Sequence, residues 1–251
     1  MSIFSYDKSQ TLNIKKIQAD ISWLSLIKLT PVFDEIAIHQ PVLDIKKEKN
    51  GDLSVNGIAV KRDKNSELSN WLLNQDDIVV YNASISWLDM TKTSEILRLN
   101  NLELHYGSSK LFSYANRRTF DASTKISHGS PHKIELNGYI DISTIDDIKT
   151  SNSQININFK ELDLKTIKLW TRYFSEINSG KADAEIRVKV NNGIIEKVNS
   201  KLIIDELMWS TKENKMVIID KLSGLIGWKN NKEYSSVKLS KLNTNIKNNL
   251  S

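Results

Sequence analysis

The residue types that most often do chemistry are few and poorly placed in this 251-residue chain. Two of its four histidines, His128 and His132, have the H-x3-H spacing at which a helix presents two metal ligands. Gly129 and Pro131 lie between them and disfavour a helix, and no adjacent carboxylate completes a site. The segment is therefore interpreted as a surface loop, and neither a metal site nor another cofactor site is predicted.

Acidic residues occur as two neighbouring pairs, Asp76-Asp77 and Asp146-Asp147. Neighbours on an extended chain point to opposite faces, so these pairs are interpreted as residues of turns and strand starts. Folding can bring two distant acids together as in a glycosidase, but nothing distinguishes two among the 30 acidic residues.

Nucleophile and phosphate motifs are also missing from the sequence. The chain has no cysteine, and "SGLIG" (223–227) has no nucleophile at the position that a hydrolase elbow requires. Gly180-Lys181 is the one Gly-Lys step, and it lacks the earlier glycine of a P-loop. No constellation of residues in the sequence therefore supports a catalytic role.

Charge and hydropathy limit the remaining classes. The formal net charge is +5, but the basic residues are dispersed among acids, so nucleic acid is not predicted as a partner. The mean hydropathy is −0.37. No apolar run approaches the roughly 20 residues that span a bilayer, and residues 1–20 contain no signal-peptide stretch. No targeting or transmembrane segment is therefore predicted within this sequence.

The elements are best defined by alternation of apolar and polar residues. "DIVVYNASISWLD" (77–89) alternates at every second position, which predicts a strand with one apolar face. Similar runs recur along the chain and predict about ten to thirteen strands. In "LRLNNLELHYG" (97–107) the apolar parity changes by one, which predicts a bulge or break at Asn100-Asn101. A hairpin turn is predicted at Asn50-Gly51.

Helical periodicity is confined to short segments. Helical elements are predicted near 66–75 and 163–175, the second with Asp163 as its N-cap and Leu164 on its apolar stripe. A single helical turn is predicted before Pro31. With no α/β alternation and no linker, residues 1–251 are predicted to form one continuous, mainly β unit.

Four stretches, in order, resemble the YhdP branch of the bacterial AsmA-like proteins, relatives of TamB. The early segment 12–60 is similar to that family's strand, short W-x-S-L turn and D/N-G-x-L hairpin. The stretch 70–89 is similar to its W-L-L-x-Q segment and to its strand ending in W-x-D. The stretches 162–209 and 218–234 follow, the last with an L-S-G-x-(I/L)-G-W pattern.

This resemblance implies a long, curved antiparallel sheet, a taco-like β-groove, with two or three short helices. It further implies a protein that is not an enzyme and that has phospholipid acyl chains as partner. The implied activity is phospholipid transport between the inner and outer membranes, which maintains the outer-membrane barrier. Full-length relatives are periplasmic and held at the inner membrane by an N-terminal anchor. The apolar positions predicted to line the groove are Val79, Tyr81, Ala83, Ile85, Trp87, Ile134, Leu136, Ile155, Ile157, Ile186 and Val188.

The chain departs from these relatives in length and lacks their anchor, so it is interpreted as a fragment of a longer protein. Exposed first or last strands are then expected to pair with the rest of such a chain or with a partner. The alternative is a β-rich structural or interaction module of the cell envelope without lipid cargo, whose apolar face is covered by the helices around Trp71 and Trp170.

Overall fold

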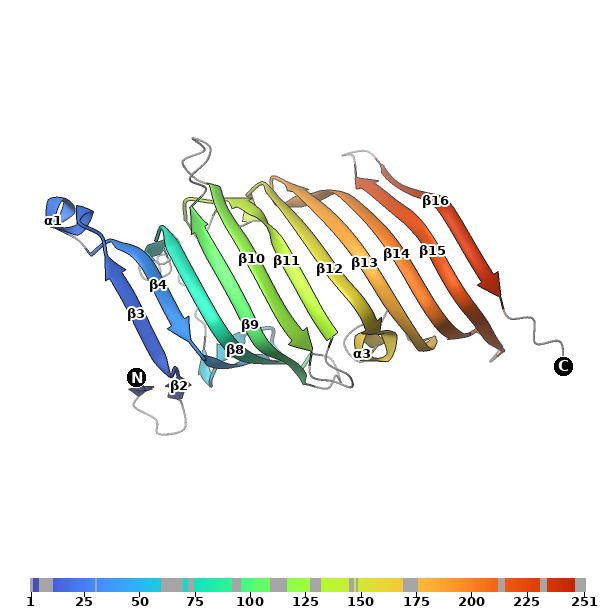
Figure 1. Cartoon of the computed structure of the whole chain (residues 1–251), viewed down its shortest axis with the longest axis horizontal. Coiled ribbons are helices and arrows are strands. Elements are labelled where there is room, and N and C mark those ends of the chain that lie inside the picture. The colour runs from blue at the N-terminus through green and yellow to red at the C-terminus, as the bar shows by residue number, and fades with distance from the viewer. Residues whose placement is uncertain are drawn as a thin grey trace.

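A computed structural model describes residues 2–4, 11–29, 31–59, 70–71, 75–91, 96–108, 117–126, 132–144, 147, 149–168, 176–211, 215–230 and 234–246. Within these ranges the chain forms a single sheet of sixteen strands (Figure 1). The short N-terminal elements are β1 (Ser2–Phe4), β2 (Thr11–Asn13), β3 (Lys16–Ile21), α1 (Leu24–Lys28), β4 (Phe33–His39), β5 (Val42–Lys47), β6 (Leu53–Val55) and β7 (Ile58–Ala59).

The remaining strands are long and follow one another along the sheet. They are β8 (Asp77–Asp89), β9 (Leu97–Ser108), β10 (Arg117–Ile126), β11 (His132–Asp141), β12 (Ser153–Asp163), β13 (Ile177–Asn191), β14 (Ile194–Ser210), β15 (Met216–Asn230) and β16 (Ser235–Ile246). Helix α3 (Leu164–Lys168) interrupts this series between β12 and β13. From β8 to β16, spatial neighbours are sequence neighbours, so this part is an antiparallel meander.

The resemblance implied an antiparallel sheet, whereas the observed sheet is mixed. Strands β4 and β5 both pair with β8 in parallel, one after the other along its length. Gln40, with φ of 51°, and the buried Pro41 form the corner between them. Two tandem short strands can therefore share one long neighbour, an arrangement that alternation of apolar residues does not reveal.

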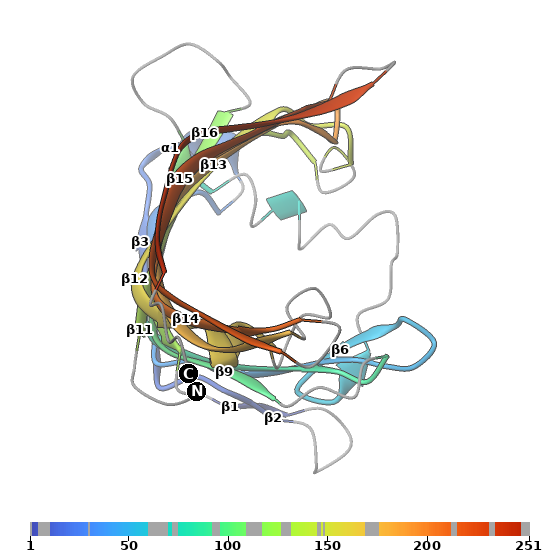
Figure 2. The same ribbon diagram turned by 90° about the vertical axis from the view of Figure 1, so that its right-hand side faces the viewer.

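Viewed along its long axis, the sheet has a C-shaped cross-section (Figure 2). This confirms a long, open, curved sheet that is mainly β, with 76% of the described residues in strands. Helices α1 and α3 have five residues each. Strand twist and β-bulges both bend a sheet in this way.

The predicted helical segments are confirmed in the parts that the structure describes. The predicted single turn before Pro31 is α1, which ends at Lys28 and is followed by Leu29 with φ of 51°. The Asp163 carboxylate accepts a hydrogen bond from Lys165 N at 2.9 Å and so caps α3 as predicted. Of the segment predicted near 66–75, residues 70–71 are helical, whereas 66–69 and 72–74 lie outside the described residues, as do residues 169–175 of the other segment.

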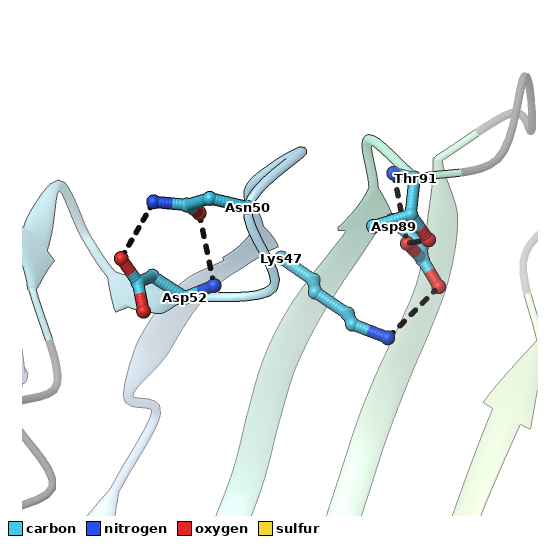
Figure 3. Close-up of polar contacts among 5 residues, drawn as sticks. All are labelled: Lys47, Asn50, Asp52, Asp89 and Thr91. Carbon is cyan, nitrogen blue, oxygen red and sulfur yellow. Dashed lines mark hydrogen bonds and ion pairs between the residues drawn. The ribbon is translucent and has the colours of Figure 1, made fainter.

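Figure 3 shows how polar contacts close the corner where β5 and β8 end. Asn50 Oδ1 accepts a hydrogen bond from Asp52 N at 3.0 Å in the predicted turn between β5 and β6. Asp89, the buried last residue of β8, lies 3.9 Å from Lys47 Nζ and accepts a hydrogen bond from Thr91 N at 3.1 Å. The corner is therefore fixed on both strands.

Candidate functional site

The most extensive surface feature is a pair of apolar rows that cross the sheet at right angles to its strands. Each row takes one residue from β4 and one from every strand between β8 and β16, because the register places them side by side. The first apolar row is Ile36, Ile78, Tyr106, Phe120, Gly138, Ile155, Val188, Val198, Trp228 and Val237. The second apolar row is Ile38, Val80, Leu104, Ala122, Leu136, Ile157, Ile186, Ser200, Ile226 and Leu239.

Between these two rows, on the opposite face, the chain presents mostly polar side chains. This polar row is Val79, His105, Asp121, Asn137, Asn156, Arg187, Asn199, Gly227 and Lys238. Its members hydrogen-bond to each other: Asn156 Nδ2 donates to Asn137 Oδ1 at 2.8 Å, and Arg187 Nε donates to Asn156 Oδ1 at 3.0 Å. The two faces of the sheet therefore differ in chemistry over its whole width.

The apolar rows lie on the concave face. Helix α3, on the inner side of the curve in Figure 2, packs Leu164 against Ala182 and Ile204, and Ala182 shares the face of Ile186 by alternation. Residues 70–71 lie within the hollow of the C in the same view, and the Trp71 ring meets Phe33 edge-on at 5.7 Å between centroids. Side chains that belong to the hollow thus contact the apolar face.

Exposure varies along the concave face. Ala83 and Ile36 are buried, the central positions are half-buried, and Val237 and Leu239 on β16 are 67% and 61% exposed. A sheet normally buries its apolar face against a second layer. In the described part of the chain, α3 and the 70–71 segment are the elements that lie over this face. Its apolar side chains therefore stay half-buried along the centre and exposed on β16, and an incompletely covered apolar surface is of a kind that marks binding sites.

The pKa of one titratable group reflects the apolar character of this surface. Tyr106 belongs to the first apolar row, and burial raises the pKa of its phenol above the ordinary value of 10.0, while the nearby Arg118 cation opposes that rise. Desolvation dominates, as expected for a phenol that lies among apolar neighbours.

The structure corrects two of the predicted groove residues. Val79 and Tyr81 lie on the opposite, polar face: Val79 pairs with His105, and the Tyr81 ring stacks on His39 at 4.9 Å. The cause is a bulge at Asn82, whose φ is 54° and whose backbone N donates to Glu103 Oε1 at 3.0 Å. The extra residue shifts the alternation by one, so that Ile78 and Val80 share the face of Ala83, Ile85 and Trp87.

The other predicted positions lie together on the concave face. Leu136 pairs with Ile157 and Ile157 with Ile186, Ile155 pairs with Val188, and Ile134 pairs with Phe159. Ala83, Ile85 and Trp87 pair with Leu102, Leu99 and Leu97.

Sequence reasoning missed several members of the rows, notably Tyr106, Phe120 and Val198. The sequence did contain a signal for the shift in alternation within β8. The bulge predicted at Asn100-Asn101 is present, with Asn101 at φ of 51°, and its side chain donates to Asn82 Oδ1 at 2.8 Å. If the strands that contain Asn82 and Asn101 are aligned as neighbours in the sequence, the bulge at Asn101 indicates a second bulge at Asn82.

The polar positions that could do chemistry have ordinary structural roles. Asp77 begins β8 and lies 2.6 Å from His105 Nε2. Asp147 accepts hydrogen bonds from Ser143 N and Thr144 N in a turn, which lowers the pKa of its carboxyl group below the ordinary value. Within the described ranges no three His, Asp or Glu side chains could hold a metal ion; His128 and Asp146 lie outside them.

A shallow hollow of about 630 Å³ lies on the polar face, over β11 to β16. Its lining includes Asn158, Glu185 and Lys201, and Lys201 Nζ is 3.6 Å from a Glu185 carboxylate oxygen. Because these side chains are hydrated and partly paired with one another, the hollow has neither the apolar lining nor the enclosure of a small-molecule site.

An open, curved sheet with this apolar inner face is what the sequence resemblance implied, and comparison with protein families agrees. The model of the family described as YhdP protein matches residues 2–251. The chain belongs to the YhdP family. No curated protein and no solved structure matches it.

Membership of the YhdP family associates the chain with a role related to lipid transport in the cell envelope. The YhdP family is a lipid-transport family and not a known class of enzymes. In the part of the chain that the structure describes, no helix has the length and apolarity needed to cross a membrane.

Proposed function

We propose that the concave face binds the acyl chains of phospholipids and that the chain forms part of a non-enzymatic route for phospholipid between the inner and outer membranes. In this role it acts in the periplasm and helps to maintain the outer-membrane barrier. The single observation that carries the proposal is the pair of apolar rows, which cross ten strands on the concave face.

The chemistry of the rows suits a sliding ligand. Apolar contact is non-directional, so a methylene chain can move from one row residue to the next without breaking a specific bond. Each methylene removed from water contributes about 0.8 kcal/mol, which makes retention of an acyl chain favourable. The charged headgroup stays hydrated outside the hollow, because burying it would cost far more than the chain contacts return.

The test combines lipid analysis with a photocrosslinker at neighbouring positions. We expect phospholipid to co-purify with the protein from bacteria that have an inner and an outer membrane. Native mass spectrometry and lipid extraction would detect it. A crosslinking amino acid at Ile186 should capture lipid, whereas the same amino acid at Arg187, on the opposite face, should not. Absence of phospholipid together with equal crosslinking at the two sites would contradict the proposal.

The alternative, a structural module without lipid cargo, is favoured by one observation. Helix α3 and residues 70–71 already contact the concave face through Leu164 and Trp71. If the chain covers its own apolar face, the crosslinker at Ile186 should capture protein segments and no lipid. The same experiment therefore separates the two functions.

A further inference from the structure

The most exposed apolar side chains of the N-terminal part gather around helix α1. We call this cluster the α1 tip: Ile21, Trp23, Leu26, Ile27 and Leu29, each between 66% and 90% exposed. The tip lies at one end of the sheet, beyond β3 (Figure 1). Scattered exposed apolar residues are normal in proteins, but five within nine positions form a patch.

Hydrogen bonds hold the tip so that its polar groups face the sheet. Ser25 Oγ donates to Val32 O and accepts from Val32 N, both at 2.8 Å, and Ser22 N donates to Val32 O at 2.9 Å. Ser22 is buried. With both serines directed to the start of β4, the large apolar side chains of the turn project outward.

The tip is continuous with the concave apolar face. Ile21 is the last residue of β3 and pairs with Phe33, while Ala19, two positions earlier, pairs with Ile36 of the first apolar row. By alternation Ile21 and Ala19 share one face of β3. An apolar surface therefore runs from the tip through Ile21 and Phe33 to the rows.

We propose that the α1 tip docks on a lipid bilayer, where Trp23, Leu26 and Ile27 insert into the interfacial region. The inference deepens the proposed function, because it identifies where acyl chains would enter the concave face. The tip projects from one end of the molecule with five exposed apolar side chains, and residues 21–33 contain a single charge, Lys28. A tryptophan beside aliphatic residues and a lysine suits the boundary between headgroups and acyl chains.

A second copy of the chain is a poorer occupant. The hollows of about 630 and 470 Å³ on the polar face have amide and charged side chains in their linings, so they make poor sockets for an apolar projection. A bilayer needs no complementary socket, because it deforms around the inserted side chains.

The first experiment measures binding of the full chain to vesicles of phosphatidylethanolamine and phosphatidylglycerol by co-flotation. The tip variant Trp23→Ser/Leu26→Ser/Ile27→Ser should bind at least about tenfold more weakly than the unmodified chain, since three inserted apolar side chains are lost. The matched control, Ile194→Ser/Trp209→Ser/Met216→Ser, changes side chains that are 48–62% exposed elsewhere on the sheet and should bind as the unmodified chain does.

The second experiment uses the absence of cysteine from the chain. A fluorophore attached to Leu26→Cys should shift to shorter wavelength with vesicles and be quenched by brominated lipids, whereas one on Met216→Cys should not. Equal vesicle binding by the tip and control variants, or a tip variant that changes only self-association, would overturn the inference. Lipid co-purification with the tip variant is measured separately, so loss of bilayer docking and failure of the concave face to hold lipid can be told apart.

Discussion

At the scale of single residues, Asn82 decides which side chains of β8 face the hollow. Asparagine adopts positive φ more readily than other non-glycine residues, and here the Glu103 carboxylate and the Asn101 amide hold it there. A bulge at a residue suited to this conformation is thus a built feature of the sheet. It places Val80, and not Tyr81, in the second apolar row.

The corrected register gives a direct test of the lining. Val80→Asp should reduce the amount of co-purifying lipid by about tenfold, because a carboxylate in an apolar surface is poorly solvated. Tyr81→Asp should leave it unchanged, since Tyr81 lies on the polar face against His39. Quantitative lipid extraction of the two purified variants is the measurement, and the reverse order of effects would show that the alternation continues unbroken through Asn82.

The backbone conformation at Asn82 makes a second residue-scale prediction. Asn82→Val should lower the free energy of unfolding by about 1–3 kcal/mol, because a β-branched residue is strained at φ of 54°. Asn82→Gly, which has no such strain, should cost less even though it loses the hydrogen bond from Asn101. Urea unfolding followed by circular dichroism compares the two; equal losses would argue against strain as the cause.

Asp147 should make stability depend on pH through its turn. The pKa of its carboxyl group is lowered by hydrogen bonds from the Thr144 and Ser143 amides, so the folded state favours the ionised form. This contribution is fully present above the ordinary pKa of 3.8 and is lost as pH falls through the lowered folded-state pKa. Asp147→Ala should therefore be less stable than the unmodified chain at neutral pH, with the difference shrinking in strong acid; a difference independent of pH would contradict this.

At the scale of elements, glycine sets how closely two strands approach. A Cβ at Gly138 would lie 2.0 Å from the backbone oxygen of Gln154 on β12 and 3.0 Å from the end of the Phe120 ring. The aromatic ring on β10 thus covers the glycine on β11, an arrangement that stabilises strand pairs containing glycine. The first apolar row depends on this close approach at its centre.

Gly138→Ala should therefore destabilise the sheet by about 1–3 kcal/mol or prevent folding, because strands β11 and β12 must move apart. Gly224→Ala is the matched control, since its Cβ would meet nothing closer than 3.4 Å. Thermal unfolding of both variants is the measurement. Similar melting temperatures for the two would mean that β12 can shift without cost.

The alternation of apolar and polar residues predicts where the strands lie better than it predicts how neighbouring strands pair. The alternation of "HKIELNGYIDI" and "SQININF" predicts the faces of β11 and β12 correctly, because no bulge interrupts the predicted positions. In β8 the same reasoning fails at Asn82, since a bulge depends on which strand lies alongside. The parallel pairing of β4 and β5 with β8 is likewise a contact between distant segments, and strands as short as β6 and β7 carry too few residues to show a period.

At the scale of the whole molecule, the sheet remains open at β16. In the described structure β16 pairs with β15 alone, and Val237, Leu239 and Leu242 are exposed along it. A long edge strand with apolar side chains is a template for further strand pairing. The proposed partner is a further strand, from a longer chain or another molecule, which would extend both apolar rows.

We accordingly expect the isolated chain to associate with rising concentration. Leu239→Lys should reduce that association, because charge on an edge strand opposes pairing. Sedimentation velocity over a range of concentrations gives the comparison, with Ser240→Lys on the opposite face as a control that makes the same change in net charge. A monodisperse monomer at high concentration would count against an adhesive edge.

The order of the strands also has a consequence for how the chain acquires its structure. From β8 onward each strand pairs with the one just before it in sequence, so every new hairpin can form on a template that already exists. Contacts of short sequence separation form quickly, whereas β4 and β5 must wait for β8 across the intervening chain. The N-terminal part of the sheet, which comprises β3, α1, β4 and β5, should therefore be the last part to acquire protection from hydrogen exchange during refolding.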